Sequence, residues 1–184
     1  MIIREMTWDD LPGVVALDRE NFDPVEQWSE NGFLTHLLRD DTIYLVAEEE
    51  DAAASGPEAA GEDTEKPAGT ISGYAGMITS FSDGDVTKLS VRKECRRRGI
   101  GRALLCGMLE MAAEKQVVNV YLEVRVSNEP AIRLYEACGF EKIGVRRRYY
   151  LSPPEDAAVM QYTAEQKKKD DPSGGNAGGS REQE

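Results

Sequence analysis

The chain has 184 residues, of which 40% are hydrophobic and 30% charged, and its formal net charge at pH 7 is -12. This length suits one domain with a sizeable core, and no apolar stretch is long enough to predict a membrane span. The N-terminus lacks the layout of a secretory signal peptide, so we expect a globular protein of the cytoplasm without a membrane partner. The spacings of Cys95, Cys106 and Cys138 suit neither a disulfide framework nor a zinc site, so we expect reduced thiols and no metal.

The negative charge is concentrated in one segment. Between Glu48 and Lys66 the net charge is -7, which leaves about -5 for the rest of the chain, where arginines gather at 96–102 and 146–148. An evenly acidic surface would repel nucleic acid, and we expect no direct contact with it. The uneven distribution is instead typical of a basic pocket for an anionic small molecule within a mildly acidic protein.

The first half of the chain predicts a strand, two helices and two further strands. Their ranges are 2–4, about 7–20 with Thr7 as N-cap, about 27–38, 42–48 and 69–78. Residues 49–68 lack an apolar period and cannot bury enough surface to offset the entropy lost on ordering. We therefore expect an acidic disordered loop inserted between two antiparallel strands.

Aromatic side chains mark the connection between the two predicted helices, where Phe22 and Trp28 flank Pro24. Large aromatic residues at such a place either cover the core or form the rim of a substrate groove, and the sequence leaves both possibilities open. His36 is the only histidine and has no catalytic partner nearby. We expect it at the surface or in helix packing.

The second half of the chain predicts strands that alternate with helices, followed by two further strands. The strands are expected at 85–91, 117–125, 140–150 and 157–162, with helices from the 96–102 turn to about 116 and from 129 to 137. Together these elements predict one α+β domain over 1–163, with helices on both faces of a mixed, mostly antiparallel sheet. A disordered tail is expected at 164–184. The two central strands that each precede a helix should run parallel, and such a pair can splay apart and open a slot.

The turn from Arg96 to Arg102 carries the first functional signal. It follows a buried strand and begins a helix, whose first amides have no partner within the helix and carry the positive end of its dipole. Gly99 and Gly101 remove side chains that would keep a phosphate from the backbone. A plain tight turn with solvated arginines is the alternative. No Walker loop occurs, and Leu104 stands where a dinucleotide fingerprint needs a third glycine.

A second motif decides between these possibilities. The pattern N-x-x-A-x-x-L-Y-x-x-x-G-F runs without a gap from Asn128 to Phe140, and [RQ]-x-x-G-x-[GA] runs from Arg96 to Gly101. In this order, and separated by one strand, the two motifs resemble those of the GNAT superfamily of acetyl-CoA-dependent N-acetyltransferases. The resemblance covers roughly residues 2–163. It implies the GNAT fold, with a sheet splayed between two parallel strands, and acetyl-CoA as cosubstrate.

Within the superfamily the chain is similar to RimI-type protein N-terminal acetyltransferases. The likeness lies in Leu122–Asn128, in Phe22 with Trp28–Glu30, and in Arg147–Tyr150 followed by Glu155–Ala157. It implies transfer of acetyl to a protein N-terminus, with the N-terminal alanine of a ribosomal protein as the first candidate. A GNAT enzyme for small amines or for a broader set of N-termini, and a silent acyl-CoA-binding regulatory module, are the alternatives. The acidic insertion and a longer turn at 151–154 depart from the pattern.

The resemblance also implies which residues bind the two substrates. Contacts to acetyl-CoA fall on the main chain of three strand residues, on the glycine-bearing turn and on Asn128, whose plain alternative is a helix N-cap. The implied set is Leu89, Ser90, Val91, Arg96, Arg97, Arg98, Gly99, Ile100, Gly101, Arg102 and Asn128. The acceptor side is expected at Phe22, Trp28, Tyr149 and Tyr150.

Two side chains are the expected catalytic groups. The resemblance implies that Glu123 is the general base and that Tyr135 protonates the leaving thiolate. Strand alternation puts Glu123 and Arg125 on one face, so an ion pair between them is the structural alternative, and plain core packing is the alternative for Tyr135. Cys95 would lie beside the phosphates, so no residue suits a covalent acetyl-enzyme. We expect direct attack in a ternary complex.

Overall fold

The computed structural model describes residues 1–49 and 70–164 of the chain. The loop predicted at 49–68 and the tail predicted at 164–184 lie outside the described residues, except for Glu49 and Ala164. The strands that flank the insertion pair antiparallel, as predicted. None of the helices in the described ranges has the length and apolar character needed to cross a membrane. These ranges also contain no group of three His, Cys, Asp or Glu side chains placed to hold a metal ion.

In this part of the chain, seven strands form one sheet in the order β1-β2-β3-β4-β5-β7-β6. The strands are β1 (Ile2–Glu5), β2 (Thr42–Glu49), β3 (Thr70–Ser80), β4 (Asp83–Val91), β5 (Asn119–Arg125), β6 (Glu141–Leu151) and β7 (Pro154–Thr163). The helices are α1 (Leu11–Asn21), α2 (Glu30–Leu37), α3 (Ile100–Glu114) and α4 (Glu129–Ala137), with 3₁₀ turns η1 (Trp8–Asp10) and η2 (Lys93–Cys95). The predicted order of elements and the GNAT fold are confirmed.

One predicted boundary that differs lies beside the cleft, at α2, which begins three residues later than expected. Ser29 has extended backbone angles, and its hydroxyl accepts a hydrogen bond from the amide of Gly32 at 3.1 Å. A serine in this geometry is an N-cap and ends the preceding extended segment. Residues 22–29 therefore form a connection between α1 and α2 rather than the first turn of a helix.

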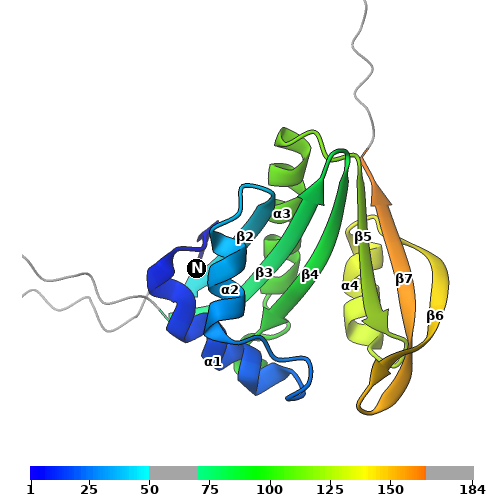
Figure 1. Ribbon diagram of the computed structural model, residues 1–184, viewed down its shortest axis with the longest axis horizontal. Coiled ribbons are helices and arrows are strands. Elements are labelled where there is room, and N and C mark those ends of the chain that lie inside the picture. The colour runs from blue at the N-terminus through cyan, green and yellow to red at the C-terminus, as the bar shows by residue number, and fades with distance from the viewer. Residues whose placement is uncertain (50–69, 165–184) are drawn as a thin grey trace, which may run out of the picture.

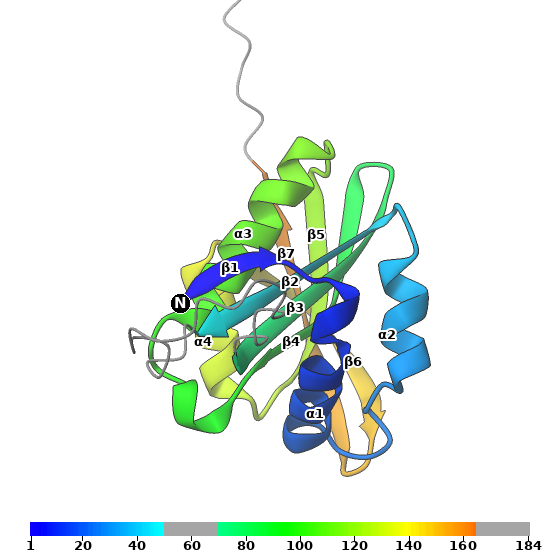
Figure 2. The same cartoon turned by 90° about the vertical axis from the view of Figure 1, so that its left-hand side faces the viewer.

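The helices pack in pairs on opposite faces of the sheet (Figures 1 and 2). α3 and α4 cover one face, where Leu104, Leu105 and Met108 are fully buried. α1 and α2 cover the other face around Phe33, whose ring meets Tyr74 edge-on with 5.6 Å between the ring centroids. Removing these apolar side chains from water is the main favourable contribution to folding.

The two central strands separate along most of their length. β4 and β5 pair in parallel at three positions, ending at Asp85 and Tyr121, and no further pairing joins them in the described chain. Both strands continue, to Val91 and Arg125, and Figure 1 shows them diverging. β3 and β7 hold their outer edges, so the opening lies within the sheet rather than at its border. The predicted splay of a parallel pair is confirmed.

The pairing of β2 with β3 requires a glycine at one position of β3. Gly76 stands opposite Tyr44, and a Cβ atom at Gly76 would lie 2.3 Å from Cε1 of the Tyr44 ring. We predict that Gly76→Ala lowers the free energy of unfolding by about 1–3 kcal/mol because the buried ring must shift. Chemical denaturation measures this change.

The matched control is Gly144→Ala in β6, where a Cβ atom would meet nothing within 4 Å. This variant should stay within about 1 kcal/mol of the unmodified protein. Equal destabilisation of the two variants would contradict the packing explanation for Gly76.

Candidate active site

A cleft of about 1020 Å³ opens where β4 and β5 diverge. Its walls come from the α1–α2 connection, β4, β5, α4 and β6. Eight of the residues predicted for the site line it, namely Phe22, Trp28, Leu89, Glu123, Asn128, Tyr135, Tyr149 and Tyr150. The fold thus brings both predicted catalytic side chains and all four predicted acceptor-side aromatics to one cavity.

A row of unpaired backbone donors follows the end of β4. Within the described part of the chain, the amides from Arg97 to Arg102 have no hydrogen-bond partner. Gly99, the N-cap of α3, has a φ of 84°, which is in the left-handed region that favours glycine. The side chains of Arg97 and Arg102 are exposed. Consecutive amides at a helix N-terminus are suited to bind a diphosphate.

Arg96 has a different place from the other arginines of the turn. Its Nη2 donates to Oδ1 of Asn21 at 2.6 Å, and its Nε donates to the carbonyl of Val91 at 3.1 Å. Its own amide donates to the carbonyl of Lys93 at 3.3 Å. These contacts tie the turn to the ends of α1 and β4, so within the described chain Arg96 holds the turn in place.

The free edge of β4 presents alternate main-chain groups to the opening. The amide of Arg92 donates to the carbonyl of Ser72 in β3 at 2.8 Å. Because successive residues of a strand alternate in direction, the backbone N–H and C=O groups of Leu89 and Val91 point away from β3. Ser90 points its backbone toward β3, and its hydroxyl accepts from Asn21 at 2.9 Å. Of the three strand residues predicted to pair with an extended ligand, Leu89 and Val91 therefore have the suitable direction. The carbonyl of Val91 already accepts from Asn21 at 3.2 Å and from Arg96 at 3.1 Å, so its amide is the group that it offers to a ligand.

Asn128 has the predicted N-cap geometry. Its Oδ1 accepts a hydrogen bond from the amide of Ala131 at 3.3 Å, and α4 begins at the next residue. The residue also lines the cleft. Its cap role is established, and its position is compatible with the predicted contact to the ligand.

Glu123 forms an ion pair that the sequence did not predict. Its Oε1 lies 2.8 Å from Nη1 of Arg146, and its side chain is 22% exposed. The alternative pairing with Arg125 is wrong, because that guanidinium binds Glu26 at 2.5 Å and Glu155 at 3.3 Å instead. A carboxylate with a cation partner at the cleft surface can exchange that partner for the ammonium of a substrate.

Tyr135 combines packing with access to the cleft. The residue is 7% exposed, and its ring lies 5.8 Å from that of Phe140 in the larger core. Burial raises the pKa of the phenol to about 12. Its hydroxyl makes no hydrogen bond to any described residue. A phenol in this state is protonated at neutral pH and is free to donate to a ligand.

Trp28 packs against the core, and both aromatic side chains of the α1–α2 connection line the cleft. Trp28 stacks on His36, with 4.5 Å between ring centroids, and meets Phe33 of the smaller core at 5.4 Å. The His36 contact matches its predicted role in helix packing. Trp28 and Phe22 also line the cleft, and the ammonium of Lys88 lies 4.0 Å from the centre of the Phe22 ring.

The two tyrosines of β6 form the opposite wall. Their rings meet edge-on at 5.1 Å, and Tyr149 is 45% exposed. The hydroxyl of Tyr150 donates to the carbonyl of Glu123 at 3.3 Å, and the guanidinium of Arg125 stacks 4.1 Å above its ring. Tyr150 is therefore fixed to β5, whereas Tyr149 is more accessible to a ligand.

Sequence reasoning missed a buried charge pair behind the acceptor wall. Nζ of Lys88 lies 2.6 Å from Oδ1 of Asp18, and both side chains are almost fully buried. Burial lowers the pKa of Lys88, and the hydrogen bond to Asp18 opposes this change. The Asp18 carboxylate also accepts from the hydroxyl of Tyr74 and from the amide of Trp28. A signal was present, since Asp18 continues the helical spacing of Leu11, Val14 and Val15.

Comparison with known proteins finds relatives among N-terminal acetyltransferases. A Bacillus subtilis protein described as a putative [ribosomal protein bS18]-alanine N-acetyltransferase is 27% identical over 147 residues, covering 80% of this chain and 85% of that one. The N-alpha-acetyltransferase RimI of Mycobacterium tuberculosis is 41% identical over 85 residues, covering 44% of this chain and 52% of that one. The second alignment thus spans about half of either protein.

Solved structures share the fold. The ribosomal-protein-S18-alanine N-acetyltransferase from Escherichia coli superposes with a TM-score of 0.68 at 24% identity, covering 88% of this chain and 92% of that chain. Arabidopsis thaliana NAA60, solved with a bisubstrate analogue, gives a TM-score of 0.72 at 17% identity, covering 89% and 98% of the two chains. At these sequence identities the likeness shows a shared fold and nothing further.

Residues 2–140 match the family model described as the acetyltransferase (GNAT) family. The matched region contains the amide row, the splayed strands and both predicted catalytic side chains. The chain therefore belongs to the acetyltransferase (GNAT) family and is an N-acetyltransferase.

Proposed function

We propose that this enzyme acetylates the N-terminal amine of a protein, with the N-terminal alanine of a ribosomal protein as the first candidate. The observation that carries the proposal is that Glu123, Tyr135 and the acceptor-side aromatics line the same cleft. The choice of substrate is supported by the Bacillus relative, a putative ribosomal-protein-alanine N-acetyltransferase, and by the Mycobacterium relative, an N-alpha-acetyltransferase.

The family uses acetyl-CoA, and the residues present fit it. The amide row from Arg97 to Arg102 has six donors for a diphosphate, and a side chain at Gly101 would approach Leu134 of α4 at 3.2 Å. The outward main-chain groups of Leu89 and the amide of Val91 would hold the extended arm of the molecule. When bound there, acetyl-CoA supplies an activated acetyl group at the splay.

Glu123 and Tyr135 would move the protons of the reaction. An α-amine has an ordinary pKa of about 8, so most of it is ammonium at neutral pH and must lose a proton before it attacks. Glu123 accepts that proton once the ammonium replaces Arg146 beside it. A C–N bond forms as the C–S bond breaks, and the Tyr135 phenol gives its proton to the departing sulfur. The surplus proton on the acetylated nitrogen then restores the phenol through solvent, and Glu123 releases its proton to solvent to complete the cycle.

The substrate class can be tested directly. We expect the purified enzyme to release CoA thiol with a peptide that starts with alanine, and to release little with spermidine. Both peptides contain an internal lysine, and the matched control differs only in its acetylated N-terminus. The control peptide should not react. Turnover of spermidine but not of the peptide would favour the small-amine alternative. Binding of CoA without any transfer would favour a regulatory module.

We predict that Glu123→Gln lowers kcat by about a hundredfold or more, because the amide cannot accept the proton. The affinity for CoA, measured by calorimetry, should stay unchanged. Glu141→Gln is the control, since Glu141 lies exposed on β6 outside the cleft. Equal kcat values for the three proteins would exclude Glu123 as the base.

We predict that Tyr135→Phe also lowers kcat by about a hundredfold, while the nearly isosteric ring preserves the core. A proton donor is active below its pKa and inactive above it, and the pKa of this phenol is about 12. The pH profile of the unmodified enzyme should therefore show no alkaline decline from Tyr135 up to about pH 10. An unchanged kcat in Tyr135→Phe would contradict the assignment, whereas a decline near pH 9 that disappears in this variant would contradict only the raised pKa.

A further inference from the structure

Arg125, at the end of β5, contacts two segments that lie on opposite sides of the cleft. Its Nη2 lies 2.5 Å from Oε1 of Glu26, in the α1–α2 connection. The same guanidinium donates to the carbonyls of Ser152 and Pro153, each at 3.1 Å, and to Oε2 of Glu155 at 3.3 Å. Ser152 and Pro153 form the β6–β7 turn, and Glu155 follows at the start of β7. The Arg125 side chain is only 17% exposed, so most of its donors are directed at protein oxygens.

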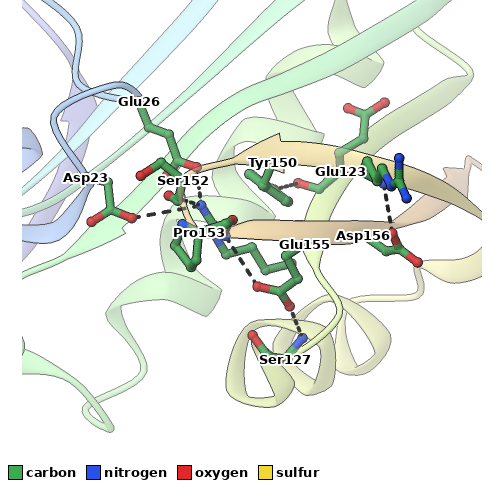
Figure 3. Close-up of polar contacts among 11 residues, drawn as sticks. Asp23, Glu26, Glu123, Ser127, Tyr150, Ser152, Pro153, Glu155 and Asp156 are labelled. Atoms are coloured by element: carbon green, nitrogen blue, oxygen red, sulfur yellow. Dashed lines mark hydrogen bonds and ion pairs between the residues drawn. The ribbon is translucent and has the colours of Figure 1, made fainter.

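Figure 3 shows how these partners face one another. Asp23 and Glu26 approach from the α1–α2 connection, and Ser152, Pro153 and Glu155 approach from the β6–β7 turn and the start of β7. Asp23 lies farther from the guanidinium, at 3.9 Å. One cation is thus shared by three carboxylates from two segments that are more than a hundred residues apart in sequence.

Glu26 is also held from the other side of the splay. The ammonium of Lys88, on β4, donates to the backbone carbonyl of Glu26 at 2.6 Å. The carboxylate of the same residue binds Arg125 on β5. Since β4 and β5 have no ladder hydrogen bonds here, the three residues connect the two strands where the sheet itself does not. We call Lys88, Glu26 and Arg125 the Glu26 bridge.

The β6–β7 turn is fixed by the same arginine and by one further contact. Oε1 of Glu155 accepts a hydrogen bond from the amide of Ser127 at 2.7 Å, while the Tyr150 ring lies 4.1 Å below the Arg125 guanidinium. If the guanidinium were removed, Asp23, Glu26 and Glu155 would lose their shared cation. Carboxylates without such a partner repel one another and take up water, so the two segments would move apart.

We propose that Arg125 is a positioning residue that holds the α1–α2 connection and the β6–β7 turn at a fixed separation around the acceptor. The proposal rests on the proposed function, because it concerns the walls between which a peptide would bind. Walls that are ordered in advance need not lose conformational freedom when the peptide enters. The bridge should therefore act on binding of the peptide rather than on acetyl-CoA or on the chemical step.

The test compares two variants of the bridge. Arg125→Met keeps the stem over Tyr150 and removes the guanidinium, and Glu26→Gln leaves the other contacts of Arg125 intact. We expect KM for the alanine-starting peptide to rise about tenfold or more in Arg125→Met, with kcat and KM for acetyl-CoA within about twofold of the unmodified enzyme. Arg125→Lys should restore part of the affinity, since it keeps the charge but not the fork of donors.

A double-variant cycle connects the effect to the bridge. If Glu26 and Arg125 act through each other, the rise in KM of the double variant should be smaller than the product of the two single rises. Arg39→Met is the matched control, because Arg39 pairs with Asp41 on the exposed surface at 2.6 Å, away from the cleft. Its kinetic constants should equal those of the unmodified enzyme.

Amide hydrogen exchange separates this proposal from the proposed function. Residues 22–29 and 151–155 should exchange faster in Arg125→Met, whatever amine the enzyme acetylates. Faster exchange in an enzyme that acetylates no peptide would support the role of the Glu26 bridge and overturn the proposed substrate. An unchanged peptide KM together with unchanged exchange would overturn the bridge. If Arg125→Met fails to fold, Glu26→Gln decides in the same way.

Discussion

The end of the β4–β5 ladder at Asp85 and Tyr121 is the constraint on which the rest of the site depends. Backbone groups in the interior of a sheet need hydrogen-bond partners, and beyond this point the facing edges of the two strands have none in each other. The edge of β4 up to the amide of Val91 therefore offers extended main-chain groups to a ligand. Because β3 and β7 hold the outer edges, the opening persists without loss of the sheet, and the cleft follows from pairing rather than from loop shape.

Charge divides the surroundings of this opening into two regions. Beyond the end of β4, the unpaired amides from Arg97 to Arg102 and their exposed arginines favour an anion. Among the residues that line the cleft, Glu26 and Glu123 each have an arginine partner, and burial raises the pKa of Asp85. Of these two pairs, the one between Glu123 and the exposed Arg146 can exchange its cation for an incoming ammonium. An arrangement of this kind favours an anionic donor at one end and a cationic acceptor at the other.

Local patterns were sufficient to predict the order of elements and the bounds of α4, whereas Glu123 and Tyr135 were expected at the opening because of the resemblance to the GNAT superfamily. Local patterns failed where contacts join distant parts of the chain. Strand alternation suggested Arg125 as the partner of Glu123, but the actual partner, Arg146, lies two strands away, beyond β7. Alternation states which side chains share a face, and it does not state which of several neighbouring carboxylates a guanidinium will bind. The Lys88–Asp18 pair joins residues 70 positions apart and has the same origin.

The late start of α2 shows why such contacts decide the shape of the acceptor side. A helix beginning near Gln27 would have placed Trp28 in its first turn. Instead, the amide of Trp28 donates to the buried carboxylate of Asp18 at 2.7 Å, and Ser29 caps the helix that follows. The segment before Ser29 is therefore held by polar contacts to α1, β4 and β5 rather than by its own helical propensity, which is a weak determinant of structure. Since this non-helical segment carries the Glu26 carboxylate to Arg125, the wall of the cleft is built by the same tertiary contacts that displaced the helix boundary.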